Sequence, residues 1–256
     1  MLTFVGLGLY DERDISIKGR NVVEEADRVF AEFYTSALPG ATEEDLEDLY
    51  GREVEVLSRQ DVEEDADEIL SSAEDGDAVF LSGGDAMVST THADLRLRAT
   101  ERRIETDVVH ASSVSSAVSG ATGLQNYRFG ASTTLPFPKG DWKPESPLDT
   151  VYQNLDRDLH TLVYLDIEDE GSEDRFMRVE QAAEILAEMD SGKRIGSGVG
   201  VARMGSGSTE VAWGSLNELA ETDLGPPLHT LVIPGTLHEI EREYLGSVHS
   251  LREEKS

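Results

Sequence analysis

The stretch LTFVGLG, residues 2–8, decides the architecture of the N-terminal half of the chain. The apolar run Leu2–Val5 passes directly into a pair of glycines, which predicts a buried strand that ends in a tight turn. Further strands are predicted at residues 29–34, where apolar residues alternate, and at 53–57, 78–81 and 107–110. Segments with helical spacing separate these strands, and this alternation is typical of an α/β fold with a mainly parallel sheet.

The helices of this half are predicted from the spacing of their apolar residues. The clearest pattern spans residues 62–73 and indicates one amphipathic helix with an acidic, solvated face. Its apolar face consists of Val62, Ala66, Ile69, Leu70 and Ala73. Other helices are predicted from residue 17, from Thr42 with Asp45 as capping-box partner, and over residues 91–103.

The second half repeats this style less regularly. Strands are predicted at residues 160–167, 199–202 and 231–233, and helices at 114–119, 148–159, 182–189 and 237–245. Residues 136–147 hold four of the eight prolines and are predicted to form a loop. A boundary near residues 110–113 divides the chain into two α/β domains, 1–110 and 111–256, both of ordinary domain size.

The chain is strongly acidic. Asp and Glu number 52 against 22 Lys and Arg, which gives a formal net charge of -30. Such a field repels phosphates and anionic headgroups, so neither nucleic acid nor a membrane surface is an expected partner. The charge is spread along the whole chain and Lys is scarce, which resembles proteins of salt-accumulating halophiles. The alternative is an acidic surface for a basic partner. Disorder is expected only at residues 251–256.

Several classes of protein are disfavoured by what the sequence lacks. No apolar run reaches the ~18 residues of a membrane span, and no cationic leader or cleavage site opens the chain, so a cytoplasmic protein is expected. There is no Cys for a disulfide, a thiol nucleophile or an iron–sulfur cluster. The six His lack metal-pair spacing, so no metal is expected. No Walker A lysine follows a glycine loop.

Small, flexible residues follow several of the predicted strands. They are Gly6-Leu7-Gly8, Gly83-Gly84-Asp85, Ser112-Ser113 and Gly205-Ser206-Gly207. In open α/β sheets ligands bind beyond the carboxyl ends of strands, and glycine lets backbone approach them closely. The pattern therefore predicts a ligand cleft. Glu32 ends the second strand, where a ribose-binding acid would stand, but Asp11 breaks the dinucleotide fingerprint and NAD is not expected.

Several strings in the sequence resemble the diphthine synthase family, and together they cover nearly the whole chain in order. The most specific are YDERD (10–14) and AEFYTS (31–36). The others are VLSRQDVE (56–63), FLSGGDAMVSTTHADLRLRA (80–99), VHASSVSSAVSGATGL (109–124), HTLVYLDI (160–167) and PPLHTLVIPGTLHEIEREYL (226–245). The Gly84-Asp85 pair alone would indicate only the wider superfamily of tetrapyrrole-type methyltransferases.

The resemblance implies two α/β domains of the tetrapyrrole-methylase type, an S-adenosylmethionine cleft between them, and a homodimer. It implies methylation of the modified histidine (3-amino-3-carboxypropyl-histidine) of translation elongation factor 2, which gives diphthine in diphthamide biosynthesis. The matching motifs imply cofactor contacts at Leu9, Asp85, Val88, Ser113, Val114, Leu165, Met204 and His229. The chain departs from the family at Ala86, where Pro is usual, and at Met204, where a small residue is common.

The sequence does not identify the group that deprotonates the acceptor amine. Asp85 is one candidate base, but we expect it to bind the cofactor or to cap backbone N–H groups. His229 is expected to contact the adenosine end of the cofactor. Two other functions stay open: a corrin-ring methyltransferase of the same superfamily, which YDERD and AEFYTS disfavour, and a non-catalytic protein that binds the cofactor.

The halophile interpretation predicts a fold whose stability depends on salt. The surplus of negative charge repels itself in dilute buffer, and molar KCl shortens the screening length to roughly 3 Å. We expect the midpoint of thermal unfolding to rise between dilute buffer and molar KCl. Equal midpoints under the two conditions would contradict the halophile interpretation.

Overall fold

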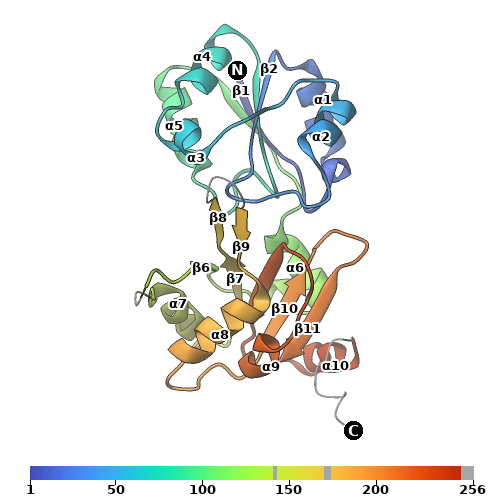
Figure 1. The fold of residues 1–256 in the computed structure, drawn as a ribbon, viewed down its shortest axis with the longest axis vertical. Helices are drawn as coiled ribbons and strands as arrows, with labels where there is room; N and C mark the ends of the chain where they lie inside the picture. The colour runs from blue at the N-terminus through green and yellow to red at the C-terminus, as the bar shows by residue number, and fades with distance from the viewer. Residues whose placement is uncertain (141–142, 170–173, 249–256) are drawn as a thin grey trace. The chain divides into compact units, whose positions relative to one another are not determined.

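The computed structural model describes residues 1–140, 143–169 and 174–248. These residues form two compact units, the first ending at Val114 and the second beginning at Ser115. Each unit contains its own five-stranded sheet together with helices (Figure 1). The predicted α/β class is therefore confirmed, whereas the expectation of disorder at residues 251–256 concerns a segment outside the described residues.

The sheet of the first unit is entirely parallel, with the order β3-β2-β4-β1-β5. Each strand corresponds to one that the sequence predicts: β1 (Leu2–Gly6), β2 (Arg28–Glu32), β3 (Glu55–Val56), β4 (Ala78–Ser82) and β5 (Thr106–Val109). The opening strand β1 lies inside the sheet, where Phe4 is paired with Phe80 of β4 and with Val108 of β5. A strand buried on both faces needs mainly apolar residues, and Leu2, Phe4 and Val5 provide them, with Thr3 buried among them.

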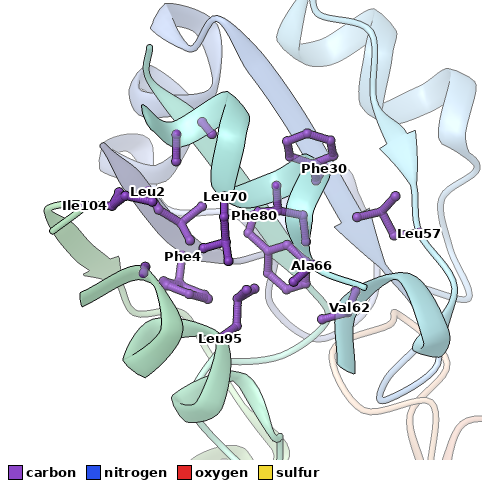
Figure 2. Packing of buried hydrophobic residues seen from close by; sticks show 14 of the residues in the cluster. Leu2, Phe4, Phe30, Leu57, Val62, Ala66, Leu70, Phe80, Leu95 and Ile104 are labelled. Atoms are coloured by element: carbon purple, nitrogen blue, oxygen red, sulfur yellow. The ribbon is translucent and has the colours of Figure 1, made fainter. Parts of the chain in front are cut away.

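One face of this sheet is covered by three helices. They are α3 (Arg59–Glu63), α4 (Asp67–Asp75) and α5 (His92–Glu101). Phe4, Phe30 and Phe80 point to this face from three neighbouring strands and pack against apolar residues of the helices (Figure 2). The rings of Phe4 and Phe80 meet edge to face with centroids 5.8 Å apart, a favoured aromatic geometry.

The opposite face is covered by α1 (Ile17–Glu25) and α2 (Glu43–Tyr50), as Figure 1 shows. Val5, Ala31 and Leu81 alternate with the phenylalanines along the strands and pack with these helices in a second core. The predicted capping box at the start of α2 is present, with both of its hydrogen bonds.

The single helix predicted over residues 62–73 is wrong, because the chain forms two short helices there, α3 and α4. A capping box between Ser58 and Asp61 starts α3 early. The N–H of Asp65 then bonds to the carbonyl of Gln60, five residues back, which ends the helical ladder. Both helices turn their apolar residues into the same core, so the periodicity of one long helix persists across the break.

The chain leaves the adjacent strands β1 and β4 towards opposite faces of the sheet. After β1 it forms α1, which belongs to one core, and after β4 it forms α5, which belongs to the other. Open α/β sheets bind their ligands at such a divergence, outside the carboxyl ends of the two strands. We therefore expect a ligand to bind near the segments that follow β1 and β4.

The second unit contains a mixed sheet with the order β11-β10-β12-β7-β6. Its strands are β6 (Thr133–Leu135), β7 (Thr161–Leu165), β10 (Gly198–Ala202), β11 (Glu210–Gly214) and β12 (His229–Ile233). Only β6 and β7 pair in parallel, and the other neighbours are antiparallel. The sequence predicts β7, β10 and β12 but misses β6 and β11, the two edge strands.

One face of this second sheet packs against α7 (Ser146–Leu155), α8 (Val179–Met189) and α9 (Leu216–Ala220). The second unit also contains α6 (Val114–Thr122, which begins at the boundary), α10 (Glu239–Val248), the short helix η2 (Asn126–Arg128), and the antiparallel pair β8 (Ile167–Asp169) and β9 (Asp174–Phe176). The short helix η1 (Glu12–Asp14) belongs to the first unit. Among the helices of the described residues, none combines the length and the apolar character that crossing a membrane requires.

A buried carboxylate, Glu241, holds the first turn of α10 in place. Its oxygens accept hydrogen bonds from the Arg128 guanidinium at 2.8 Å and from His160 Nε2–H at 3.1 Å. The backbone N–H groups of Gln125 and His238 donate to it at 2.9 and 2.7 Å. Burial acts to raise the pKa of Glu241, but these donors hold it below its usual range, so the group stays charged.

The ring of His160 is neutral in this arrangement. Gly235 N–H donates to Nδ1 at 3.1 Å, so the ring hydrogen sits on Nε2, which faces Glu241. Burial is the largest influence on this imidazole and lowers its pKa. A lowered pKa means that the unfolded chain binds the proton more readily. The contribution of His160 to stability is therefore present above the ordinary value of 6.5 and declines below it.

Removing the Glu241 carboxylate should destabilise the protein strongly. Glu241→Ala leaves the buried Nε2–H of His160 and Nη1 of the largely buried Arg128 without their acceptor, and we expect a loss of about 3–5 kcal/mol. The matched control is Glu239→Ala on the same turn, an exposed change expected to stay within about 0.5 kcal/mol. Urea denaturation of both variants measures the difference. Equal stabilities would show that Glu241 does not hold α10.

Candidate functional site

Two glycine loops at the carboxyl edge of the first sheet hold each other. Gly84 N–H donates to the Gly8 carbonyl at 2.6 Å, and Gly8 N–H donates to the Gly84 carbonyl at 3.1 Å. A Cβ at Gly6 would lie 2.6 Å from the carbonyl oxygen of Gly84 and 2.8 Å from Cβ of Ala111. Gly6 is thus required because the chain segments after β4 and β5 converge on it.

Gly84 and Gly8 need glycine for different reasons. Gly84 has a φ of +67°, and a Cβ built on it would meet no atom within 4 Å. Gly8 has a φ of +90°, and a Cβ there would collide with Asp14 of the same loop. Glycine is therefore needed at position 8 because of a contact within the chain and not because of a ligand. The space beside Gly84 is open, which fits a ligand that approaches the backbone closely.

Asp85 joins the loop after β4 to the end of β5. Its side chain is buried, and Oδ1 accepts a hydrogen bond from Met87 N–H at 3.0 Å. Oδ2 accepts from Ala111 N–H at 3.2 Å and from His110 Nδ1–H at 2.8 Å. The expected capping of backbone N–H groups is present, but those groups belong to a turn and a strand end and not to a helix.

The predicted cofactor contacts of the first unit all stand on segments that follow β1, β4 and β5. Leu9 lies half-buried after the first glycine loop. Val88 lies three residues beyond Asp85, in a turn closed by its own N–H on the Asp85 carbonyl at 3.0 Å. Ser113 is buried, and Val114 is half-buried at the start of α6. Three adjacent strands thus direct these five residues to one edge of one sheet.

A second cluster of buried polar residues lies at this edge, and the sequence does not predict that its members meet. Glu32, fully buried at the end of β2, accepts hydrogen bonds from Ser82 Oγ at 2.6 Å and from Thr35 N–H at 3.0 Å. Nε2 of the buried His92 lies 3.3 Å from Glu32, and Nδ1–H donates to the Ala86 carbonyl at 2.8 Å. Burial acts to raise the pKa of Glu32, but these partners hold it below its usual range.

This cluster fixes the loop that carries Asp85. Glu32 is occupied by protein donors and is not available to a ribose hydroxyl, in line with the absence of a dinucleotide fingerprint. Ala86, which stands where the family usually has Pro, is fully buried and is held through its carbonyl by His92. The rigidity that a proline would give to this position is thus replaced in part by a hydrogen bond.

Three predicted contacts belong to the second unit and share one edge of its sheet. Leu165 ends β7, His229 begins β12, and Met204 comes two residues after the end of β10. Because β12 lies between β7 and β10 and runs antiparallel to both, its start meets their ends. Leu165 and Met204 are half-buried, and His229 is buried.

The ring of His229 is engaged within the protein. Val179 N–H donates to Nδ1 at 3.1 Å, so Nε2 carries the hydrogen and lies 3.1 Å from the carbonyls of both Gly225 and Pro226. Burial lowers the pKa of His229 and keeps it neutral. Neither ring nitrogen is available to a ligand, so a contact from His229 has to come through its backbone or its ring carbons.

The residue at the first edge that the sequence does not predict is His110, whose ring Nδ1–H donates to Asp85. It directly follows β5 and is the exposed member of the pair. Its only signal in the sequence is a polar residue at the carboxyl end of a strand. Within the described ranges, no group of three or more His, Asp or Glu side chains is arranged to hold a metal ion.

Comparison with known proteins identifies the family. Residues 1–220 match the family described as Tetrapyrrole (Corrin/Porphyrin) Methylases. The chain is 55% identical over 247 residues to diphthine synthase of Methanospirillum hungatei, with 96% of each chain covered. It is 52% identical to diphthine synthase of Haloarcula marismortui, over 97% of this chain and 98% of the relative. A crystal structure of diphthine synthase is similar with a TM-score of 0.88 at 39% identity, covering 97% of this chain and 96% of the other.

The chain therefore belongs to the tetrapyrrole methylases, a family of methyltransferases, and within that family to the diphthine synthases. The family resemblance carried by YDERD and AEFYTS is confirmed. The contacts between individual residues and the cofactor remain predictions. The structure groups these residues at one edge of each sheet.

The open space beside Gly84 gives a test of the first edge. Gly84→Ala should weaken binding of S-adenosylmethionine by at least tenfold, because the new Cβ would occupy the space where the ligand approaches. Gly51→Ala is the matched control, since Gly51 has a φ of +65° and a Cβ there also meets nothing within 4 Å. Both variants carry the same left-handed strain, about 1 kcal/mol. Calorimetry that finds equal affinities for the two variants would place the cofactor elsewhere.

Proposed function

We propose that this chain methylates the amino group of 3-amino-3-carboxypropyl-histidine on translation elongation factor 2, with S-adenosylmethionine as the donor, and so produces diphthine. The observation that carries the proposal is 55% identity to a diphthine synthase over 96% of both chains. Similarity at this level extends through both units of the fold. It therefore includes every segment on which a cofactor contact is predicted.

The chemistry matches what the site contains. S-adenosylmethionine supplies a methyl group that its sulfonium centre already activates, so the displacement needs neither a metal nor a thiol. The tasks left to the protein are to hold donor and acceptor in line and to manage one proton. The glycine loops offer backbone polar groups at close range, and the buried Asp85 and Glu32 keep those loops rigid.

In this proposal the cofactor is bound by two sets of residues. The first set stands at the carboxyl edge of the parallel sheet: Leu9, Asp85, Val88, Ser113 and Val114. The second stands at one edge of the mixed sheet: Leu165, Met204 and His229. Asp85 acts mainly by shaping its loop, because its carboxylate already accepts three hydrogen bonds. His229 acts through its backbone or ring carbons, because both ring nitrogens are engaged.

We further propose that the enzyme is cytoplasmic and acts as a homodimer on its protein substrate. The family resemblance supports the homodimer, and a substrate in the translation machinery supports the cytoplasm. The net charge of -30 supports the exclusion of nucleic acid as a partner.

Methyl transfer to the elongation factor tests the proposal directly. Factor 2 carrying 3-amino-3-carboxypropyl-histidine is incubated with the full chain and labelled S-adenosylmethionine in molar KCl. The same factor with an unmodified histidine is the matched control. Mass spectrometry of the histidine peptide should show added methyl groups, up to the trimethylammonium form, on the first substrate only.

Two outcomes contradict the proposal. Label transferred to a corrinoid ring and not to the factor would make the chain a ring methyltransferase of the same superfamily. Calorimetric binding of S-adenosylmethionine with transfer to neither substrate would make it a non-catalytic binding protein.

A further inference from the structure

An exposed imidazole and a buried carboxylate form a pair at the carboxyl edge of the first sheet. The side chain of His110 is 70% exposed, whereas that of Asp85 is 8% exposed. Nδ1 of the ring lies 2.8 Å from Oδ2 of the carboxylate. Backbone N–H groups of Met87 and Ala111 hold the carboxylate from the protein side. Asp85 is therefore fixed in position, and it orients His110 towards solvent.

This pair adjoins the glycine loops. A Cβ at Gly6 would come within 3.1 Å of Cα of Asp85 and 2.8 Å of Cβ of Ala111, the residue after His110. Val5, just before Gly6, is paired with Val109, just before His110. The imidazole thus stands beside the backbone at which the proposed cofactor approaches.

The contact with Asp85 decides which ring nitrogen carries the hydrogen. An ionised carboxylate only accepts hydrogen bonds, so Nδ1 of His110 must donate. In the neutral ring Nε2 then carries a lone pair, which is the form that accepts a proton. Once the ring is protonated, the negative charge of Asp85 at 2.8 Å stabilises the imidazolium.

We infer that Nε2 of His110 is the base that takes the proton from the acceptor amine, an inference that rests on the proposed function. The substrate ammonium gives H⁺ to Nε2, and the freed nitrogen lone pair forms the bond to the methyl carbon. The bond from that carbon to sulfur breaks, and its electron pair stays on sulfur as a neutral thioether. The imidazolium returns the proton to water, so the ring can serve one proton in each successive methylation.

The other histidines of the described residues are less suited to this role. His92, His160 and His229 are fully or almost fully buried and have contacts at both ring nitrogens. His238 is exposed but follows the end of β12, whereas the predicted contacts of the second unit stand at the start of that strand. Asp85 itself is a poor base, because its lone pairs already accept three hydrogen bonds. It is a positioning residue that acts through His110.

Single-turnover methyl transfer in full-length variants tests the inference, with cofactor and modified factor 2 both saturating. His110→Ala should lower the rate by ~10²-fold or more, the range of a lost general base. Its affinity for S-adenosylmethionine, measured by calorimetry, should stay within about threefold of the wild type. Added imidazole should restore part of the rate. His238→Ala, the matched control, should transfer at the wild-type rate and show no response to imidazole.

A second variant separates a base from a structural group. His110→Asn can keep a hydrogen bond from its side-chain N–H to Asp85, but it cannot take a proton. We expect His110→Asn to be as slow as His110→Ala. A wild-type rate in either variant, or a loss in His110→Ala that imidazole does not relieve, overturns the inference. Wild-type enzyme that transfers no methyl group contradicts the proposed function, and the inference falls with it.

Discussion

The hydrogen bonds of Asp85 connect the fold of this protein to its site. The carboxylate is buried, and a buried charge is tolerated only where donors surround it. Here the donors come from two places: Met87 in its own loop, and His110 and Ala111 at the end of β5. The bond from Met87 therefore closes the loop after β4, and the bond from Ala111 anchors this loop to the end of β5. The bond from His110 sets the orientation of the one exposed imidazole at this edge of the described structure.

The sheet of the first unit makes that contact useful. β1 and β4 are neighbours whose chains leave towards opposite faces, and open α/β sheets bind their ligands outside the carboxyl ends of such strands. Glycines at positions 6 and 84 let the loops approach each other and leave one side open. The buried pair of Glu32 and His92 also holds the loop after β4. Glu32 accepts a hydrogen bond from Ser82, and His92 donates one to the carbonyl of Ala86. A methyl transfer that needs positioning more than reactive groups suits such a site.

Local patterns in the sequence predict much of this fold. The central strands β1 and β4 follow from their mainly apolar runs, and the start of α2 follows from Thr42 and Asp45. The break between α3 and α4 is missed because both helices serve one core, and β6 and β11 are missed because edge strands need less apolar surface. For the site, the glycine loops are predicted by composition. The pairs Asp85–His110 and Glu32–His92 are not, because tertiary folding alone joins residues so far apart in the chain.

The tautomer of His110 is the most direct test of this account, because it reports the Asp85 contact and the state of the reacting nitrogen together. Long-range proton–nitrogen NMR correlations of ¹⁵N-histidine-labelled protein, recorded at a pH where the ring is neutral, distinguish the two ring nitrogens. The exposed His238 serves as an internal reference for an unconstrained ring. We predict that His110 carries its hydrogen on Nδ1 and has a bare Nε2, and that Asp85→Ala abolishes this preference. A His110 ring with its hydrogen on Nε2, or one indifferent to Asp85→Ala, would contradict it.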